Sequence, residues 1–368
     1  MPSQTGGRQT LRTHARSAVG CGLTGFALLQ VGLSVVMDRW APVLHDPEYG
    51  HKLALLRARQ AEHPDWPLVL VLGSSRSGIG LSPAAFPKLA IEGHSALVFN
   101  FAITGCGPIQ ELQTFRRLLR HGVRPQRVLI EVHPLLLHQD HGIGEETWLD
   151  PRRLDLADVG TVGRYVGHPW SLYERWCRLR LSPWYSNRFL ILNRFARSWL
   201  EAQHHQDAWT HLSGDGWLPY GRQEIPADEY RKGVEHARRE YGPMLADFHV
   251  TATADAALTA LLRACGDEGI PAALYLMPEG SEFRGWYSPP ARREIADYLA
   301  RLRQTYGVPV YDATAWCDDG DFWDSHHLLA TGAQRFSERF GGQAVREFLA
   351  GSYYTSRGRP RGVSQNTR

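Results

Sequence analysis

The sequence is poor in lysine and has no strong excess of charge of either sign. Lysine occurs only as Lys52, Lys88 and Lys232, so the basic residues are almost all arginines, and these are dispersed along the chain. The formal net charge of +3, from 41 basic and 38 acidic residues, lacks the concentrated basic surplus of nucleic-acid-binding domains. The composition therefore does not indicate a nucleic-acid partner.

Cysteine is also scarce, and its spacing excludes the common zinc sites. No C-x-x-C pair occurs, so we do not expect a zinc site. We also expect no cofactor. An odd number of cysteines outside the cytoplasm leaves at least one thiol unpaired, and the sequence does not define the pairing. The five are Cys21, Cys106, Cys177, Cys265 and Cys317.

One long run without charge is present, at residues 17–37. Its length of about 20 residues suits a membrane span. Arg8, Arg12 and Arg16 precede it, which places the N-terminus in the cytoplasm and the remainder in the periplasm or outside the cell. We therefore predict a single-pass inner-membrane protein. A cleaved signal peptide is the alternative, but the run ends in Met37-Asp38-Arg39-Trp40, which is more typical of an interfacial stop than of a cleavage site.

The remaining chain divides by composition. We expect a polar, disordered cytoplasmic tail at 1–16, a connector at 38–66 with a helix over 51–62, and a second disordered tail at 351–368. Between them, apolar runs beginning near Leu68, Ala96, Arg127, Ala272 and Val308 alternate with helical periods. This alternation predicts an α/β fold at 67–350, a flavodoxin-like three-layer α/β/α arrangement around a parallel sheet.

The expected helices of this domain open at Ser82-Pro83 and cover 108–119, 254–265, 291–306 and 331–349. The alternation stops over about 138–250, which we interpret as an insertion or lid rich in tryptophan, tyrosine, arginine and histidine. Its aromatic side chains would suit sugar stacking, and packing within a lid is the simpler explanation. They include Trp148, Trp170, Trp176, Trp184, Tyr185, Trp209, Trp217 and Tyr220.

Two short motifs at opposite ends of the domain carry the chemistry. Gly73-Ser74-Ser75-Arg76 follows the first predicted strand, and Asp324-Ser325-His326-His327 precedes the last predicted helix. The carboxyl ends of parallel strands form the usual site of open α/β sheets. A serine there becomes a nucleophile when an imidazole accepts its proton and a carboxylate orients the imidazole.

In this order, the motifs resemble the SGNH/GDSL superfamily of serine hydrolases. The resemblance implies Ser75 as nucleophile, His327 as base with His326 as second choice, and Asp324 as the orienting acid. Ser74 stands where the family has aspartate. Asn100-Phe101-Ala102-Ile103-Thr104-Gly105 matches the second family block and implies Gly105 as an oxyanion donor beside the Ser75 amide. The third block departs from the family, since its asparagine is missing and Glu131-Val132-His133 stands there; His133 is the candidate replacement donor.

Further polar residues around these blocks are candidates for substrate binding. The loop after the fourth predicted strand contains three of them. The full set is Arg76, Asn100, Glu279, Arg284 and Tyr287.

The anchored members of the superfamily with a Gly-Ser/Thr-Ser-Arg block resemble alginate-type polysaccharide O-acetylation proteins. The expected function is thus a membrane-anchored, extracytoplasmic esterase or carbohydrate O-acetyltransferase, acting on an acyl ester or an acetylated carbohydrate. A catalytically inactive domain that binds glycan or a cell-envelope assembly partner is the alternative. Metal binding through His138, His141, His204 and His205 is a third reading, for which surface histidines are the better explanation.

Overall fold

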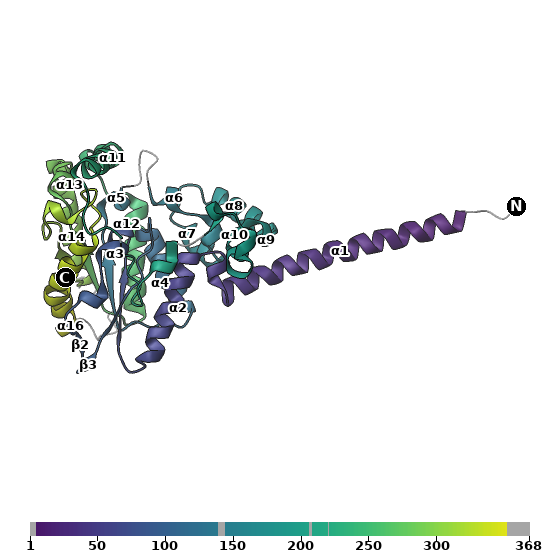
Figure 1. The fold of residues 1–368 in the computed structure, drawn as a ribbon, viewed down its shortest axis with the longest axis horizontal. Helices are drawn as coiled ribbons and strands as arrows, with labels where there is room; N and C mark the ends of the chain where they lie inside the picture. Colours follow the sequence, from purple (N-terminus) through teal and green to yellow (C-terminus); the bar gives the residue numbers. More distant parts are fainter. Residues whose placement is uncertain (1–4, 139–143, 206–207, 220, 352–368) are drawn as a thin grey trace, which may run out of the picture. The chain divides into compact units, whose positions relative to one another are not determined.

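The structure, a computed structural model, describes residues 5–138, 144–205, 208–219 and 221–351. The chain forms two compact units (Figure 1). The anchor unit consists of Met1–Gly50, Asp150–Val159 and Trp170–Asp207, and the sheet unit consists of His51–Leu149, Gly160–Pro169 and Ala208–Arg368. The predicted C-terminal tail lies, beyond residue 351, outside the described residues, as do His141 and Tyr220.

The sheet unit is built on five parallel strands, which confirms the predicted α/β class. They are β1 (Leu68–Leu72), β4 (Leu97–Asn100), β5 (Arg127–Glu131), β6 (Ala272–Leu276) and β7 (Val310–Asp312). Their order in the sheet is β4-β1-β5-β6-β7, and all four pairings are parallel. All residues of β1, β4 and β6 are buried, so both faces of the sheet are covered, since successive side chains point to opposite faces.

The strand order places a topological switch at β1. The chain leaves β1 for β4 on one side and later enters β5 on the other side. Loops that follow strands on the two sides of such a point diverge and leave a crevice at the carboxyl ends of the strands. The turn after β1, which contains Ser75, lies at this position.

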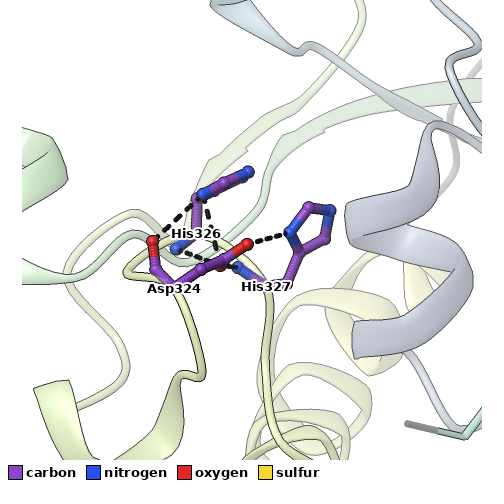
Figure 2. Close-up of side chains that lie close together, drawn as sticks. All are labelled: Asp324, His326 and His327. Carbon is purple, nitrogen blue, oxygen red and sulfur yellow. Dashed lines mark hydrogen bonds and ion pairs between the residues drawn. The ribbon is translucent and has the colours of Figure 1, made fainter. Parts of the chain in front are cut away.

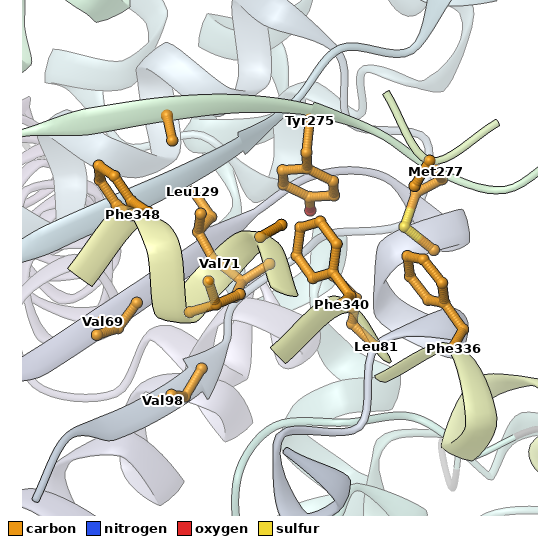
Figure 3. Packing of buried hydrophobic residues seen from close by; sticks show 14 of the residues in the cluster. Val69, Val71, Leu81, Val98, Leu129, Tyr275, Met277, Phe336, Phe340 and Phe348 are labelled. Carbon is orange, nitrogen blue, oxygen red and sulfur yellow. The ribbon is translucent and has the colours of Figure 1, made fainter. Parts of the chain in front are cut away.

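One face of the sheet packs against the C-terminal helical segment. This segment consists of α15 (Ala330–Phe340), a π-helical turn (Gly341–Val345) and α16 (Arg346–Ala350). Phe336, Phe340 and Phe348 cluster there with Val71 and Tyr275 of the strands (Figure 3). Burying each large side chain contributes roughly 1.5–3 kcal/mol. This cluster therefore holds α15, which follows the Asp324–His327 loop, against the sheet that contains β1, the strand before Ser75.

Most predicted helices of the sheet unit are present with small shifts of their ends. They are α4 (Pro108–Arg120), α12 (Ala252–Asp267) and α14 (Pro289–Tyr306). The helix predicted to open at Ser82 is wrong: only a 3-10 turn, Pro83–Ala85, forms there, and the helix begins earlier, as α3 (Ser75–Gly80). Further elements of the unit are the antiparallel pair β2 (Ala90–Ile91) and β3 (His94–Ser95), and α5 (Pro134–Leu137), α6 (Glu145–Trp148), α11 (Ala227–Ala246) and α13 (Ser281–Gly285).

The anchor unit begins with one long helix, α1 (Thr5–Arg39). Its stretch His14–Arg39 is long and apolar enough to cross a membrane and is almost entirely exposed. The helix already starts at Thr5, so the prediction of disorder over 1–16 is wrong for residues 5–16. Further helices of this unit are α8 (Pro169–Leu181, in this unit from Trp170 on), α9 (Pro183–Ser186) and α10 (Arg188–Phe195), with the 3-10 turns Pro42–Leu44, Pro151–Arg153, Arg197–Trp199 and Ala202–His204.

The unit boundaries fall inside α2 (Pro47–Glu62) and α7 (Leu156–Val162), and after the first residue of α8. The predicted insertion at about 138–250 is likewise divided. Its parts Asp150–Val159 and Trp170–Asp207 belong to the anchor unit, and its other described parts belong to the sheet unit. The insertion therefore does not form one lid.

Candidate active site

The turn between β1 and α3 presents Ser75 at the carboxyl edge of the sheet. Ser74 caps α3, with its hydroxyl accepting a hydrogen bond from the Arg76 amide at 3.1 Å. A Cβ on Gly73 would lie 2.5 Å from a carboxylate oxygen of Glu131 and 2.7 Å from Ser77 Oγ. Only glycine fits there, which explains the residue that opens the motif.

Ser75, His327 and Asp324 form a connected chain of side chains. Ser75 Oγ lies 3.0 Å from His327 Nε2, and His327 Nδ1 lies 2.7 Å from Asp324 Oδ2 (Figure 2). Both distances are within working hydrogen-bond reach. The structure thus brings together the three residues predicted as catalytic, although Ser75 and His327 are 252 positions apart.

A left-handed residue shapes the loop that carries the acid and the base. Ser325 has a φ of 71°, a conformation that a non-glycine residue adopts at a cost of order 1 kcal/mol or more. The turn lets one oxygen of Asp324 accept the amides of His326 and His327, at 3.1 and 2.7 Å, while the other faces the His327 ring. The Ser325 hydroxyl accepts the Phe283 amide at 3.1 Å, which holds the loop from outside.

The electrostatics of the loop keep Asp324 ionised. Burial alone would raise the pKa of its carboxyl, but the nearby rings of His327 and His326 and the hydrogen bonds from His327 hold that pKa well below its ordinary value. An ionised carboxylate at Nδ1 places the ring proton on that nitrogen and leaves Nε2 free to accept the serine proton.

His326 has a different environment from its neighbour. It stacks on Phe283 at 5.2 Å between ring centroids and meets Tyr241 edge-on at 5.4 Å, and its Nδ1 lies 3.2 Å from the Asp324 carbonyl oxygen. Burial, followed by repulsion from His327, lowers the pKa of His326 to about 3. His326 is therefore a neutral packing residue, and His327 is the ring that faces Ser75.

This burial predicts acid sensitivity. The unfolded chain protonates His326 near its ordinary pKa of 6.5, whereas the folded protein does not until about pH 3. The contribution of His326 to the free energy of unfolding should thus be constant above about pH 6.5 and decrease below it, by about 1.4 kcal/mol per pH unit. Denaturant unfolding of His326→Gln between pH 7 and 4 should show a shallower fall than the unsubstituted protein. The matched change at His236, whose side chain is 73% exposed on α11, should leave the slope unaltered; equal slopes for both variants would contradict the prediction.

A carboxylate that the sequence analysis did not select lies beneath the nucleophile turn. Glu131, at the end of β5, accepts the Ser74 amide at 2.7 Å, the Ser74 hydroxyl at 3.0 Å and the Ser77 hydroxyl at 2.6 Å. Ser77 also bonds the buried Tyr275 hydroxyl at 2.7 Å. A charged residue that follows the apolar run Val128-Leu129-Ile130 was the only sequence signal. Glu131 positions the turn from which Ser75 projects.

The second block contains one residue that the structure assigns differently. Asn100 is wholly buried, and its amide donates to the carbonyls of Ser77 and Leu81 at 2.8 and 2.7 Å. The prediction that Asn100 contacts substrate is therefore wrong, because its buried amide is already hydrogen-bonded to the backbone of α3 and of the residue that follows it. The loop is tied to the nucleophile turn by the Ile103 amide, which donates to Gly73 O at 2.9 Å.

Gly105 lies further along this loop, with a φ of 73°. A Cβ there would be 2.8 Å from Cβ of Trp148, so both the backbone conformation and the close approach of the tryptophan require glycine. Its role as an oxyanion donor remains a prediction.

The third block places an unpaired imidazole near the site. Both ring nitrogens of His133 are buried and have no hydrogen-bond partner among the described residues. Burial, with repulsion from Arg76, His326 and His327, lowers its pKa well below the ordinary value. His133 is therefore neutral, with one N–H to donate. A buried unsatisfied donor costs roughly 1–3 kcal/mol, which makes it a candidate for a substrate contact.

Arg76 lies under the site and not on its surface. Its guanidinium donates to the carbonyls of Met277 and Pro278 at 3.1 and 2.8 Å and pairs with Glu279 at 3.3 Å. The side chain is 1% exposed, so the prediction that Arg76 contacts substrate is wrong: the arginine ties α3 to the loop after β6.

Arg284 and Tyr287 both contact Glu279, the acidic partner of Arg76. The Tyr287 hydroxyl donates to Glu279 at 2.9 Å, and Arg284 donates to the carbonyls of Glu279 and Thr314. Burial raises the pKa of Glu279, although Arg76 opposes this. The three side chains line a cavity of about 260 Å³, together with Pro134, Leu276, Arg292, Ile295, Ala296, Leu299, Asp312 and Thr314. Their predicted substrate contact therefore requires a ligand in this cavity.

Among the described residues, the group that could hold a metal ion is Asp324, His326 and His327, with ligand atoms within 4.8 Å of one another. Binding one would break the Ser75–His327–Asp324 chain, since both ring nitrogens of His327 are in use. The other histidine set is not a cluster of this kind: His138 bonds the backbone of His249, His204 stacks on Phe189, and His205 contacts Arg197. His141 lies outside the described residues.

All five cysteines carry free thiols, with Cys106, Cys265 and Cys317 buried and Cys21 and Cys177 exposed.

Comparison with known proteins adds no assignment, because no protein-family model and no curated protein sequence matches the chain.

Proposed function

We propose that the protein is a membrane-anchored, SGNH-like serine enzyme that cleaves or transfers an acyl ester. The observation that carries the proposal is the chain of contacts from Ser75 Oγ through the His327 ring to the Asp324 carboxylate. The parallel sheet with the order β4-β1-β5-β6-β7 supports it, because this order is that of flavodoxin-like folds and the serine lies at the switch point.

The reaction follows from this geometry. Ser75 Oγ attacks the acyl carbonyl as His327 Nε2 takes its proton, and the C–O bond forms while the carbonyl becomes an oxyanion. Asp324 stabilises the imidazolium. The oxyanion then collapses, the alcohol leaves with the proton from His327, and Ser75 is left acylated. In the second half, water or a carbohydrate hydroxyl gives its proton to His327 Nε2 and attacks the acyl carbon. The bond between Ser75 Oγ and the acyl group then breaks, and Ser75 takes the proton back from His327. With water the product is a free acid, as in an esterase; with a carbohydrate hydroxyl it is a new ester, as in an O-acetyltransferase.

The oxyanion is proposed to bind the amides of Ser75 and Gly105 and the ring N–H of His133. One such donor contributes about 3 kcal/mol to transition-state stabilisation. With the family asparagine absent, the unpaired His133 ring is the side chain available to replace it.

Trapping the acyl-enzyme tests this proposal. Full-length protein in detergent, incubated with p-nitrophenyl acetate, should release nitrophenol and carry an acetyl group on Ser75 by peptide mass spectrometry. Ser75→Ala should lose both signals, while Ser82→Ala, a change at a buried serine outside the Ser75–His327–Asp324 chain, should retain them. Equal activity of Ser75→Ala and the unsubstituted protein would reject the proposal that Ser75 is the nucleophile of a serine enzyme.

The missing third-block asparagine favours a second candidate, an inactive SGNH-like domain that binds glycan or an envelope assembly partner. Protein that shows no acetylation of Ser75 but binds acetylated polysaccharide, with Ser75→Ala binding equally well, would support this candidate.

The site is proposed to face the periplasm or cell exterior, held by α1 in the inner membrane. Three arginines, Arg8, Arg12 and Arg16, precede the apolar span, and the positive-inside rule then orients it. Alkaline phosphatase fused after Trp40 should be active and a cytoplasmic reporter fused there inactive. The opposite pattern would place the site in the cytoplasm.

A further inference from the structure

The anchor unit carries most of the exposed large apolar side chains of the described chain. Outside α1, six of them come from the helices at 170–199: Trp170, Leu181, Trp184, Tyr185, Phe195 and Trp199. Trp170 and Trp199 are 81% and 80% exposed. In the sheet unit, by contrast, the exposed large apolar residues are Trp66 and Trp148. These aromatic side chains are thus not the packed core of a lid.

The same helices pack against the C-terminal part of the candidate membrane span. Gln30 and Met37 of α1 are buried, and Leu33 is partly buried between them, a spacing that marks one helix face. Met37 and Leu33 pack with Ile191 of α10 and Leu44 of the 3-10 turn after α1. Figure 1 shows α9 and α10 beside this end of α1.

This contact sets the depth of the helices. Gln30 and Met37 are seven residues apart, which is about 10 Å along a helix. The polar headgroup layer on each side of a bilayer is only about 5–8 Å thick. If 17–37 spans the hydrocarbon core, the stretch from Gln30 to Met37 forms the last ~10 Å of that core, so the helices packed against Leu33 and Met37 lie at the boundary between the hydrocarbon and the headgroup layer.

The polar side chains of these helices suit the same layer. Residues 170–205 contain six arginines and two glutamates, without lysine or aspartate. The Arg188 guanidinium lies over the rings of Tyr185 and Phe189, at 4.2 and 4.3 Å, which joins a positive charge to apolar surface. Aromatic rings with arginine are typical of membrane interfaces, and a positive surface attracts anionic lipids.

We infer that α8, α9 and α10 form an interfacial platform that lies in the headgroup layer of the bilayer spanned by α1 and contacts anionic phospholipid. The inference rests on the proposed membrane anchor. Stacking of sugars on the same rings is the competing use, but the exposed Leu181 and the packing against the span favour lipid.

Site-directed spin labelling of the full-length chain tests the inference. The background variant replaces the two exposed thiols, Cys21→Ser and Cys177→Ser. Single cysteines then carry the label at Tyr185 and Phe195 on the platform, at Leu28 on α1, and at the exposed Gln334 on α15 as control. All four are exposed, so the labels should preserve the fold, which circular dichroism checks.

In nanodiscs of phosphatidylcholine and phosphatidylglycerol, labels at 185, 195 and 28 should collide more with oxygen than with a polar nickel complex, and the label at 334 should do the reverse. The label at 185 should move toward water when phosphatidylglycerol is omitted; an unchanged depth would overturn the assignment of anionic lipid. Water-like values at 185 and 195 with a lipid-like value at 28 would overturn the platform alone. A water-like value at 28 would overturn the anchor as well. Protection at 185 and 195 only after adding polysaccharide would assign the rings to glycan and overturn the inference.

Discussion

Replacing His327 by glutamine is expected to lower acyl transfer by about 10⁴-fold, whereas the same substitution at the adjacent His326 should lower it by no more than about tenfold. Only His327 reaches the nucleophile, with Nε2 3.0 Å from Ser75 Oγ, and losing one member of such a triad typically removes several orders of magnitude of rate. His326 is stacked on Phe283 and bonds the Asp324 backbone, so it supports the loop without exchanging a proton with Ser75.

Initial rates with p-nitrophenyl acetate measure the activity of both variants. Because His326 is buried and its replacement lowers stability, the rates are measured well below the unfolding temperature of each variant. Both substitutions remove one imidazole beside the same carboxylate, so each controls for the charge change of the other. Equal losses in the two variants would show that the proton path runs differently. Asp324→Asn provides a further check, since an amide in place of the carboxylate disfavours the required ring tautomer and should cost a comparable factor.

Arg76→Met is expected to destabilise the folded protein by about 3–5 kcal/mol, the largest stability effect that we predict. The arginine is 1% exposed and its partner Glu279 is 3% exposed, and removing one member of a buried ion pair leaves the other charge without compensation. Two carbonyls, those of Met277 and Pro278, also lose their donor.

A second substitution separates the charge effect from lost packing. Glu279→Gln in the Arg76→Met background removes the orphaned carboxylate, so the double variant should be less destabilised than the two single changes added together. Chemical denaturation in detergent gives the four free energies of the cycle. Breaking an exposed pair, with Arg301→Met beside Asp255, should cost only about 0–1 kcal/mol. Additive effects within the buried pair would mean that Arg76 acts through packing alone.

The amino-acid sequence by itself determined the elements whose cause is local. Apolar runs bounded by turn residues predicted all five strands of the sheet to within two residues. For β1, β4 and β6 the reason is that a wholly buried parallel strand must be apolar along nearly its whole length. The uncharged run at 17–37 predicted a long apolar helix because its length matches a membrane span, and α1 covers this run. Ser75, Asp324 and His327 could be selected because each lies in a short motif directly after a strand or before a helix, and parallel strands bring such positions to one edge.

Only the tertiary structure decided which polar side chains face a substrate and which are buried beneath it. Arg76 and Asn100 have the residue types of binding groups, but partners about 200 and 20 positions away bury them. The role of Glu131 could not be predicted from the sequence, because it depends on hydrogen bonds from Ser74 and Ser77, which are more than 50 positions away. The different environments of His326 and His327 depend on the turn at Ser325, and the residue type does not reveal the left-handed φ of that serine. The division of the insertion, with Trp170–Asp207 joined to α1, likewise depends on contacts between distant segments, and such contacts leave no periodic pattern in the sequence.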